Sequence, residues 1–143
     1  IMVGIFLILQ NLQMSEKYNG TLECLRGLAR HNPFLAFCLS TLLFSLAGIP
    51  PLAGFFAKLY VIQPLIELKL YWLAVILVLA SVVAAYYYLR LIKFMYFDET
   101  AKAHIERIKT PHLYSLLILT LVILNLVLFI NPKFMLSFAL FIR

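Results

Sequence analysis

The sequence predicts an all-α protein, a polytopic bundle of transmembrane helices in which one helix is broken. Of its 143 residues, 64% are hydrophobic and only 13% are charged, whereas soluble domains are ~45–50% apolar and ~25% charged. A chain of this size cannot hide that much apolar surface inside itself, because small domains leave much of their surface exposed. Long apolar runs also alternate with short polar loops, so we expect lipid to surround the chain.

The first element, residues 1–12, is too short to cross a membrane. A hydrocarbon core of ~30 Å takes ~20 helical residues. We therefore expect the end of a transmembrane helix whose start lies upstream or on another chain. Since the sequence begins with isoleucine, we expect one piece of a split subunit, a fragment, or a product of a non-standard start codon. A polar loop over residues 14–32 follows.

The second element, residues 33–63, is predicted to be a broken transmembrane helix. Pro33 is suited to a helix N-terminus, but the apolar stretch is too long for one straight span. Four residues that interrupt helices lie in its middle: Gly48, Pro50, Pro51 and Gly54. Two arrangements are compatible with this pattern, namely a single crossing made of half-helices 33–47 and 54–63, or a re-entrant hairpin.

Two further helices complete the predicted module, which covers the whole chain as a single membrane unit. One spans residues 71–97, with its most apolar part ending near Leu89, and the other spans residues 111–130. A C-terminal tail, residues 131–143, follows. Three consecutive tyrosines before Arg90 are typical of an interfacial aromatic belt with a cation that reaches the headgroups.

The distribution of basic residues favours the single crossing. In that arrangement eight cations share one side: Lys17, Arg26, Arg30, Arg90, Lys93, Lys102, Arg107 and Lys109. Three lie on the other: Lys69, Lys133 and Arg143. A hairpin would split them six against five. Basic loops face the cytoplasm or matrix, and this rule accounts for the net charge of +6 without nucleic-acid binding.

Lys58 is the main candidate functional residue. Placing a charge in hydrocarbon costs at least ~2.5–3.5 kcal/mol, so an intramembrane lysine indicates function. It follows the predicted break, where half-helix ends offer free backbone groups and partial charges. Because desolvation disfavours the ammonium, such a lysine can take up and release a proton in turn. The alternative is a lysine that extends to the headgroups.

Other polar residues are weaker candidates. Ser40, Thr41, Ser45 and His31 are a candidate proton path, although membrane serines often bond their own backbone. Ser81 and Asn125 are more typical of interhelical hydrogen bonds.

No enzyme chemistry is expected on this chain itself. Cys24 and Cys38 have no metal-ligand spacing, and Cys38 is expected to be an apolar filler. The sequence contains no phosphate-binding loop and no nucleophile with an adjacent base. We therefore expect no metal and no cofactor here.

Three segments resemble one known family. FSLAGIPPLAGFFAKLY (Phe44–Tyr60), AAYYYLRLIKFMYFDE (Ala84–Glu99) and LRGLARHNPFLA (Leu25–Ala36) are similar to the antiporter-like subunits of respiratory NADH:ubiquinone oxidoreductase, complex I. Within that family, Lys58 followed by Leu59 and Tyr60 looks like the subunit 2 group. The resemblance implies the end of the eleventh helix, the discontinuous twelfth, and the thirteenth and fourteenth. Lys58 then matches the lysine of the broken helix, in the output part of a proton pathway.

This resemblance implies a membrane-arm module that translocates protons, while NADH oxidation and quinone reduction occur elsewhere in the complex. The implied partners are the N-terminal part of the same subunit, other membrane-arm subunits and lipids. The implied location is the mitochondrial inner membrane or, alternatively, a bacterial plasma membrane. Two other functions are compatible with the residues, namely a related cation/proton antiporter subunit and a structural membrane anchor.

Overall fold

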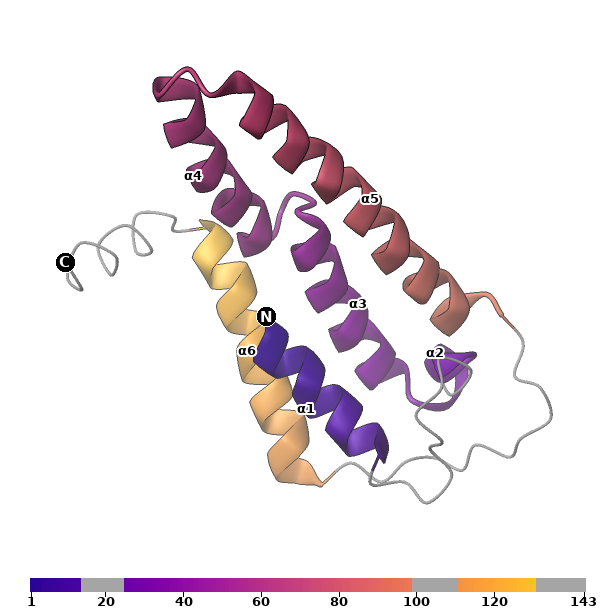
Figure 1. Ribbon diagram of the computed structural model, residues 1–143. Helices are drawn as coiled ribbons and strands as arrows, with labels where there is room; N and C mark the ends of the chain where they lie inside the picture. Colours follow the sequence, from indigo (N-terminus) through magenta and orange to yellow (C-terminus); the bar gives the residue numbers. More distant parts are fainter. Residues whose placement is uncertain (14–24, 99–110, 131–143) are drawn as a thin grey trace.

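A computed structural model describes residues 1–13, 25–98 and 111–130. Within these ranges every regular element is a helix, as the sequence predicts, and there is no strand (Figure 1). The helices are α1 (Met2–Gln13), α2 (Leu28–His31), α3 (Pro33–Ala47), α4 (Ala53–Glu67), α5 (Tyr71–Tyr96) and α6 (His112–Ile130).

The two halves of the predicted broken helix run in the same direction. In Figure 1, α3 leads upward to an irregular turn, and α4 continues upward from that turn. Helix α5 then returns along both of them and contacts both. A re-entrant hairpin would instead place α3 and α4 antiparallel. The course of the chain therefore agrees with a single crossing, broken near its middle.

Helices α5 and α6 have the length and composition of membrane spans. Helix α5 has 26 residues, which corresponds to ~39 Å at 1.5 Å per residue. Helix α6 has 19 residues. Only 6% of the apolar window of α5 and 17% of that of α6 are buried within the chain. A core helix of a soluble protein would be mostly buried, so these surfaces suit lipid or neighbouring helices.

The buried core lies between α1, α3, α6 and the end of α5. Ile8 of α1, Leu42 of α3 and Ile118 of α6 are fully buried there. Met95, near the end of α5, is also fully buried. This core holds α3 and α6 against each other, and it thereby fixes the position of α3, the helix that leads into the break.

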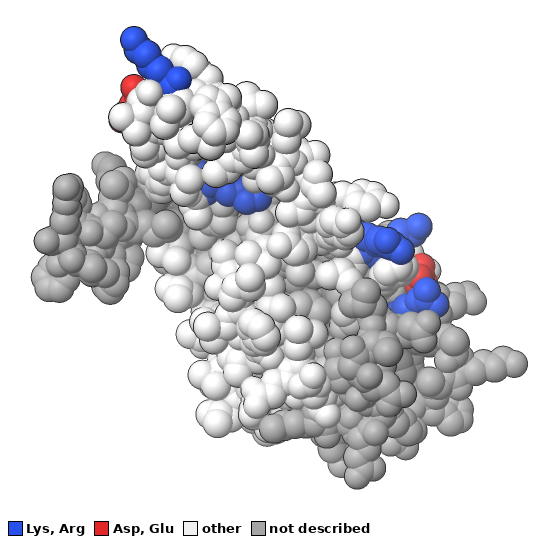
Figure 2. All heavy atoms as spheres, viewed as in Figure 1, with Lys and Arg blue, Asp and Glu red and all other residues white. Residues whose placement is uncertain are grey.

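Charge lies at the two ends of the helical unit. Figure 2 shows blue and red atoms at both ends of the visible face, with a smaller blue patch between them. Arg26, Arg30, Arg90 and Lys93 belong to the end where α2 meets the end of α5, and Lys69 belongs to the turn between α4 and α5. These five lie as the single crossing predicts. The other six counted cations lie outside the described residues.

Two expectations about element bounds were wrong. The predicted loop 14–32 contains helix α2, because Leu25 and Leu28 are buried and hold this segment against the core. The broken helix was expected to end at residue 63, but α4 continues through Pro64 to Glu67. An internal proline lacks an N–H donor and crowds the preceding turn, but the Pro64 carbonyl still accepts a hydrogen bond from the Leu68 N–H at 2.9 Å, so the helix continues.

The other predicted bounds agree closely with the structure. Helix α1 is shifted by one residue at both ends from the predicted range 1–12, and α5 and α6 differ from the predicted ranges 71–97 and 111–130 by one residue at one end. The predicted tail, residues 131–143, lies outside the described residues.

Candidate functional site

The end of α3 is closed by a glycine in the left-handed conformation. Gly48 has φ of +83°, which a side chain would disfavour. Its N–H bonds the Ser45 carbonyl at 3.0 Å, and the Ile49 N–H bonds the Phe44 carbonyl at 3.2 Å. This pair of bonds is the Schellman motif. It satisfies two of the last four carbonyls of α3 and leaves those of Leu46 and Ala47 for other donors.

The ammonium of Lys58 is the donor to Ala47. Its Nζ lies 2.7 Å from the carbonyl oxygen of Ala47, the last residue of α3. The C-terminus of a helix carries a partial negative charge of roughly half an electron, which favours a cation there. The side chain of Lys58 thus extends from the second turn of α4 back across the break to the end of α3.

Gly48 makes room for this lysine. A Cβ at Gly48 would lie 2.8 Å from Lys58 Cδ and 3.0 Å from Nζ. The glycine therefore serves two purposes, since it supplies the left-handed turn and clears the path of the lysine side chain.

The start of α4 is capped by the other half-helix. Its own N-cap residue, Leu52, has no side chain that can accept a hydrogen bond. Instead, the Gly54 N–H donates to the hydroxyl of Ser45 at 3.1 Å. The two backbones approach so closely that a Cβ at Gly54 would overlap the Ser45 carbonyl oxygen. Glycine is the only residue that permits this approach.

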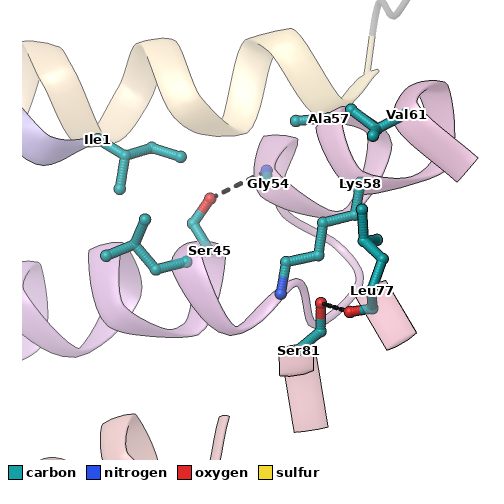
Figure 3. A pocket seen from close by; sticks show the side chains of 9 residues that line it. Ile1, Ser45, Gly54, Ala57, Lys58, Val61, Leu77 and Ser81 are labelled. Carbon is teal, nitrogen blue, oxygen red and sulfur yellow. Dashed lines mark hydrogen bonds between the residues drawn. The ribbon is translucent and has the colours of Figure 1, made fainter. Parts of the chain in front are cut away.

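Lys58 lines a pocket of about 360 Å³ between α3, α4 and α5. Figure 3 shows its side chain extending from α4 toward the end of α3. Ser45 and Ser81 are the other polar side chains in the lining, and the rest is apolar. The lysine is half-buried, so the cation lies in a largely apolar hollow that opens to the surface of the chain.

The predicted site residues fall into two groups. Gly48, Pro50, Pro51 and Gly54 all belong to the break, and Ser45 and Lys58 bridge it. Ser40, Thr41 and His31 are not brought to the pocket within the described residues.

The second group makes local contacts. Ser40 donates to the Ala36 carbonyl at 2.7 Å, and Thr41 donates to the Phe37 carbonyl at 2.9 Å. His31 contacts the Gly27 carbonyl and precedes α3. Because α3 has 15 residues, His31 lies roughly 20 Å from the break by helical rise. These contacts do not test the role in a proton path that the sequence suggested for the three residues.

Of the two predicted interhelical polar residues, one is confirmed. Asn125 of α6 accepts a hydrogen bond from Ser45 of α3 at 3.0 Å. The prediction for Ser81 was wrong, since its hydroxyl donates to the Leu77 carbonyl of its own helix at 2.8 Å. A serine in a helix has this carbonyl within reach one turn earlier, so its hydroxyl needs no partner from another helix. Cys38 is buried, as expected of an apolar filler.

Sequence reasoning missed the partners of Lys58 and Ser45. Nothing in the local sequence marks the Ala47 carbonyl as an acceptor, although a Gly at the end of a helix signals free carbonyls. Among the described residues, no group of three His, Cys, Asp or Glu could hold a metal ion. Chemically, the site places one ionisable amine, that of Lys58, on a backbone carbonyl at the edge of a largely apolar pocket.

Comparison with known proteins decides the family. The family described as NADH:quinone oxidoreductase/Mrp antiporter, TM matches residues 1–84, which include the break and Lys58. The chain belongs to this family. The resemblance drawn from the three sequence segments is thereby confirmed.

Bacterial members of the antiporter family are similar to the chain over most of its length. NADH-quinone oxidoreductase subunit N of Parvibaculum lavamentivorans is 52% identical over 72% of the chain and 21% of its own length. Subunit N of Paramagnetospirillum magneticum is 40% identical over 91% of the chain and 27% of its own length. Subunit N of Beijerinckia indica is 53% identical over 75% of the chain and 23% of its own length. The chain thus spans about a quarter of the length of these relatives.

Proposed function

We propose that the chain forms part of an antiporter-like membrane subunit of NADH:quinone oxidoreductase. Its family and its similarity to several subunit N proteins support this assignment. Subunit N is the homologue of subunit 2, the group that the Lys58 segment resembles. Electron transfer then takes place in other subunits, and this chain contributes to proton translocation without a cofactor of its own.

Lys58 carries the proton in this proposal. The observation that supports it most is the ammonium of Lys58 on the free carbonyl of Ala47, at the point where the helix is broken. That carbonyl stabilises the protonated form, while the apolar pocket around the stem favours the neutral form. Because the two influences oppose each other, a small change in the width of the break shifts the balance. Such a lysine can be loaded and unloaded in turn.

The proposal requires partners. The chain spans about a quarter of its relatives, so a complete pathway needs the N-terminal part of the subunit and other membrane-arm subunits. Lipid surrounds the outer faces of α5 and α6. We place the assembly in the mitochondrial inner membrane or a bacterial plasma membrane, and the bacterial relatives are compatible with either.

Replacing Lys58 with methionine tests the carrier role. Methionine keeps an unbranched side chain and removes the ionisable group. In the assembled enzyme, in proteoliposomes, we expect Lys58→Met to translocate fewer protons for each NADH oxidised. Lys93→Met is the matched control, because Lys93 is exposed and lies near the far end of α5. An unchanged proton ratio in Lys58→Met would remove Lys58 from the mechanism.

A related cation/proton antiporter subunit is the second candidate, because the family description includes Mrp antiporters. Purification through a tag on this chain separates the two candidates. Our proposal predicts that flavin, iron–sulfur clusters and NADH:quinone reductase activity purify with the chain. Sodium/proton exchange without any flavin would favour the antiporter. A purely structural anchor predicts no effect of Lys58→Met on either activity.

A further inference from the structure

Asn125 is a buried polar residue in the C-terminal half of the apolar helix α6. It is only 4% exposed, and its Oδ1 accepts a hydrogen bond from Ser45, which is 80 positions earlier in the chain. Burying an amide within apolar surroundings is unfavourable unless it is hydrogen-bonded. The hydrogen bond from Ser45 satisfies the oxygen of this amide, and it links α6 directly to the break.

Ser45 differs from four other helical hydroxyls among the described residues. Four hydroxyls donate to the carbonyl four residues earlier in their own helix: those of Ser40, Thr41, Ser81 and Thr120. Ser45 instead donates to Asn125 and accepts from the Gly54 N–H. A hydroxyl has one hydrogen, so its direction is decided by which acceptor takes it. Asn125 takes that hydrogen and leaves an oxygen lone pair of Ser45 facing Gly54.

The position of Gly54 determines the position of Lys58. The two residues are four apart on α4, so they lie on the same face, one turn from each other. Gly54 is held by Ser45 at 3.1 Å, and Lys58 is held by the Ala47 carbonyl at 2.7 Å. A shift of the first turn of α4 away from Ser45 would move the ammonium relative to Ala47.

We propose that Asn125 is a positioning residue for Lys58, acting through the hydroxyl of Ser45 and the backbone N–H of Gly54. This inference rests on the proposed carrier role of Lys58. The chain of contacts joins three helices, since Asn125 lies on α6, Ser45 on α3 and Gly54 on α4. Helix α6 thereby sets the geometry of the break between α3 and α4, although none of its own residues belong to that break.

The matched variants are Asn125→Leu, Asn125→Asp and Thr120→Val. Leucine fills a similar volume and removes the acceptor. Aspartate keeps an oxygen at the acceptor position. Thr120 lies on the same helix, and its hydroxyl bonds only its own helix among the described residues. All three are measured in the complete assembled enzyme.

The first readout is the rate of hydrogen exchange of the Gly54 amide. Mass spectrometry of a peptide that covers the start of α4 measures this rate. We expect Asn125→Leu to speed this exchange by about threefold to tenfold, the range that corresponds to one net hydrogen bond. Asn125→Asp should restore slow exchange, and Thr120→Val should leave it unchanged. Unchanged exchange in Asn125→Leu overturns the inference.

The second readout is the number of protons translocated for each NADH oxidised. We expect Asn125→Leu to lower this proton ratio and Asn125→Asp to keep it at the wild-type value. In a Lys58→Met background, Asn125→Leu should cause no further decrease of the ratio. A purely structural defect would lower the amount of assembled enzyme in both backgrounds equally. If Asn125→Leu speeds the exchange of the Gly54 amide but translocates protons normally, the positioning role is overturned. Normal translocation in Lys58→Met overturns the carrier role and with it the positioning role, while the exchange data still report whether Asn125 holds the break.

Discussion

Ser45 and Lys58 cap opposite ends of the same break, each from the other half-helix. The Ser45 hydroxyl of α3 accepts the Gly54 N–H of α4 at 3.1 Å, and the Lys58 ammonium of α4 donates to the Ala47 carbonyl of α3 at 2.7 Å. Backbone groups freed inside a membrane must find partners within the protein, because lipid offers none. This reciprocal capping keeps the break closed and holds a cation at its centre.

Gly54→Ala tests how closely the half-helices must approach. The added methyl group would overlap the Ser45 carbonyl oxygen, which belongs to the backbone and cannot rotate away. We expect a loss of stability of about 1–3 kcal/mol, typical of overpacking, measured as the thermal midpoint of the assembled enzyme. Gly4→Ala is the control, since its methyl would meet the ends of the Leu42 and Leu121 side chains and no backbone atom of another helix. Equal stability of the two variants contradicts this contact.

Gly48→Ala tests the glycine that turns the chain beneath Lys58. Alanine at φ of +83° costs about 1–2 kcal/mol, and its Cβ would displace the lysine stem. We expect lower stability together with a lower ratio of protons to NADH. Gly48→Asn separates the two effects, because asparagine tolerates the left-handed region and still crowds Lys58. A proton ratio in Gly48→Asn that matches the wild type would show that the space beside Lys58 does not matter.

Ser40→Ala and Thr41→Ala test whether the other hydroxyls of α3 join the proton path. Each hydroxyl bonds its own helix and lies outside the lining of the pocket. We therefore expect proton translocation within experimental error of the wild type for both. Ser45→Ala on the same helix should lower it, because the cap on Gly54 is lost. A defect in Ser40→Ala as large as that in Ser45→Ala would extend the path along α3.

Arg26→Met tests the contact between α2 and the end of α5. The Arg26 guanidinium lies 5.4 Å from the centre of the Phe94 ring and 3.6 Å from an Asp98 oxygen. Exposed contacts of these kinds contribute about 0.2–1 kcal/mol each. The Gly27 N–H bonds the Phe94 carbonyl nearby, so we expect its hydrogen exchange to accelerate about twofold to tenfold.

Arg30→Met is the matched control for that measurement, because Arg30 is exposed on α2. Raising the salt concentration should weaken the exposed pair with Asp98 and should speed the same exchange in the wild type. Exchange at Gly27 that is insensitive to both the Arg26 substitution and salt would show that the backbone bond alone holds α2.

The broken helix and its lysine could be predicted from the sequence because their signals are local. Glycines and prolines interrupt an apolar run, and a single cation follows them within a few residues. The count of basic residues also separated the single crossing from the hairpin, since charge bias acts on whole loops and needs no side-chain geometry.

The partners across the break could not be predicted, because they depend on packing. Ser45 and Asn125 are 80 residues apart, and no pattern in either helix indicates that they meet. Helix α2 was also missed. It has four residues, too few to form by local propensity, and it depends on the burial of Leu28 and on the Phe94 carbonyl.

Lys58→Arg tests the central claim most directly. Arginine keeps a positive charge and donors that can reach the Ala47 carbonyl, but it does not release its proton in a protein. The measurement is the ratio of protons translocated to NADH oxidised in proteoliposomes of the assembled enzyme. If Lys58 carries the proton, Lys58→Arg should assemble normally and show the same reduced ratio as Lys58→Met. A wild-type ratio in Lys58→Arg would show that the cation only caps α3.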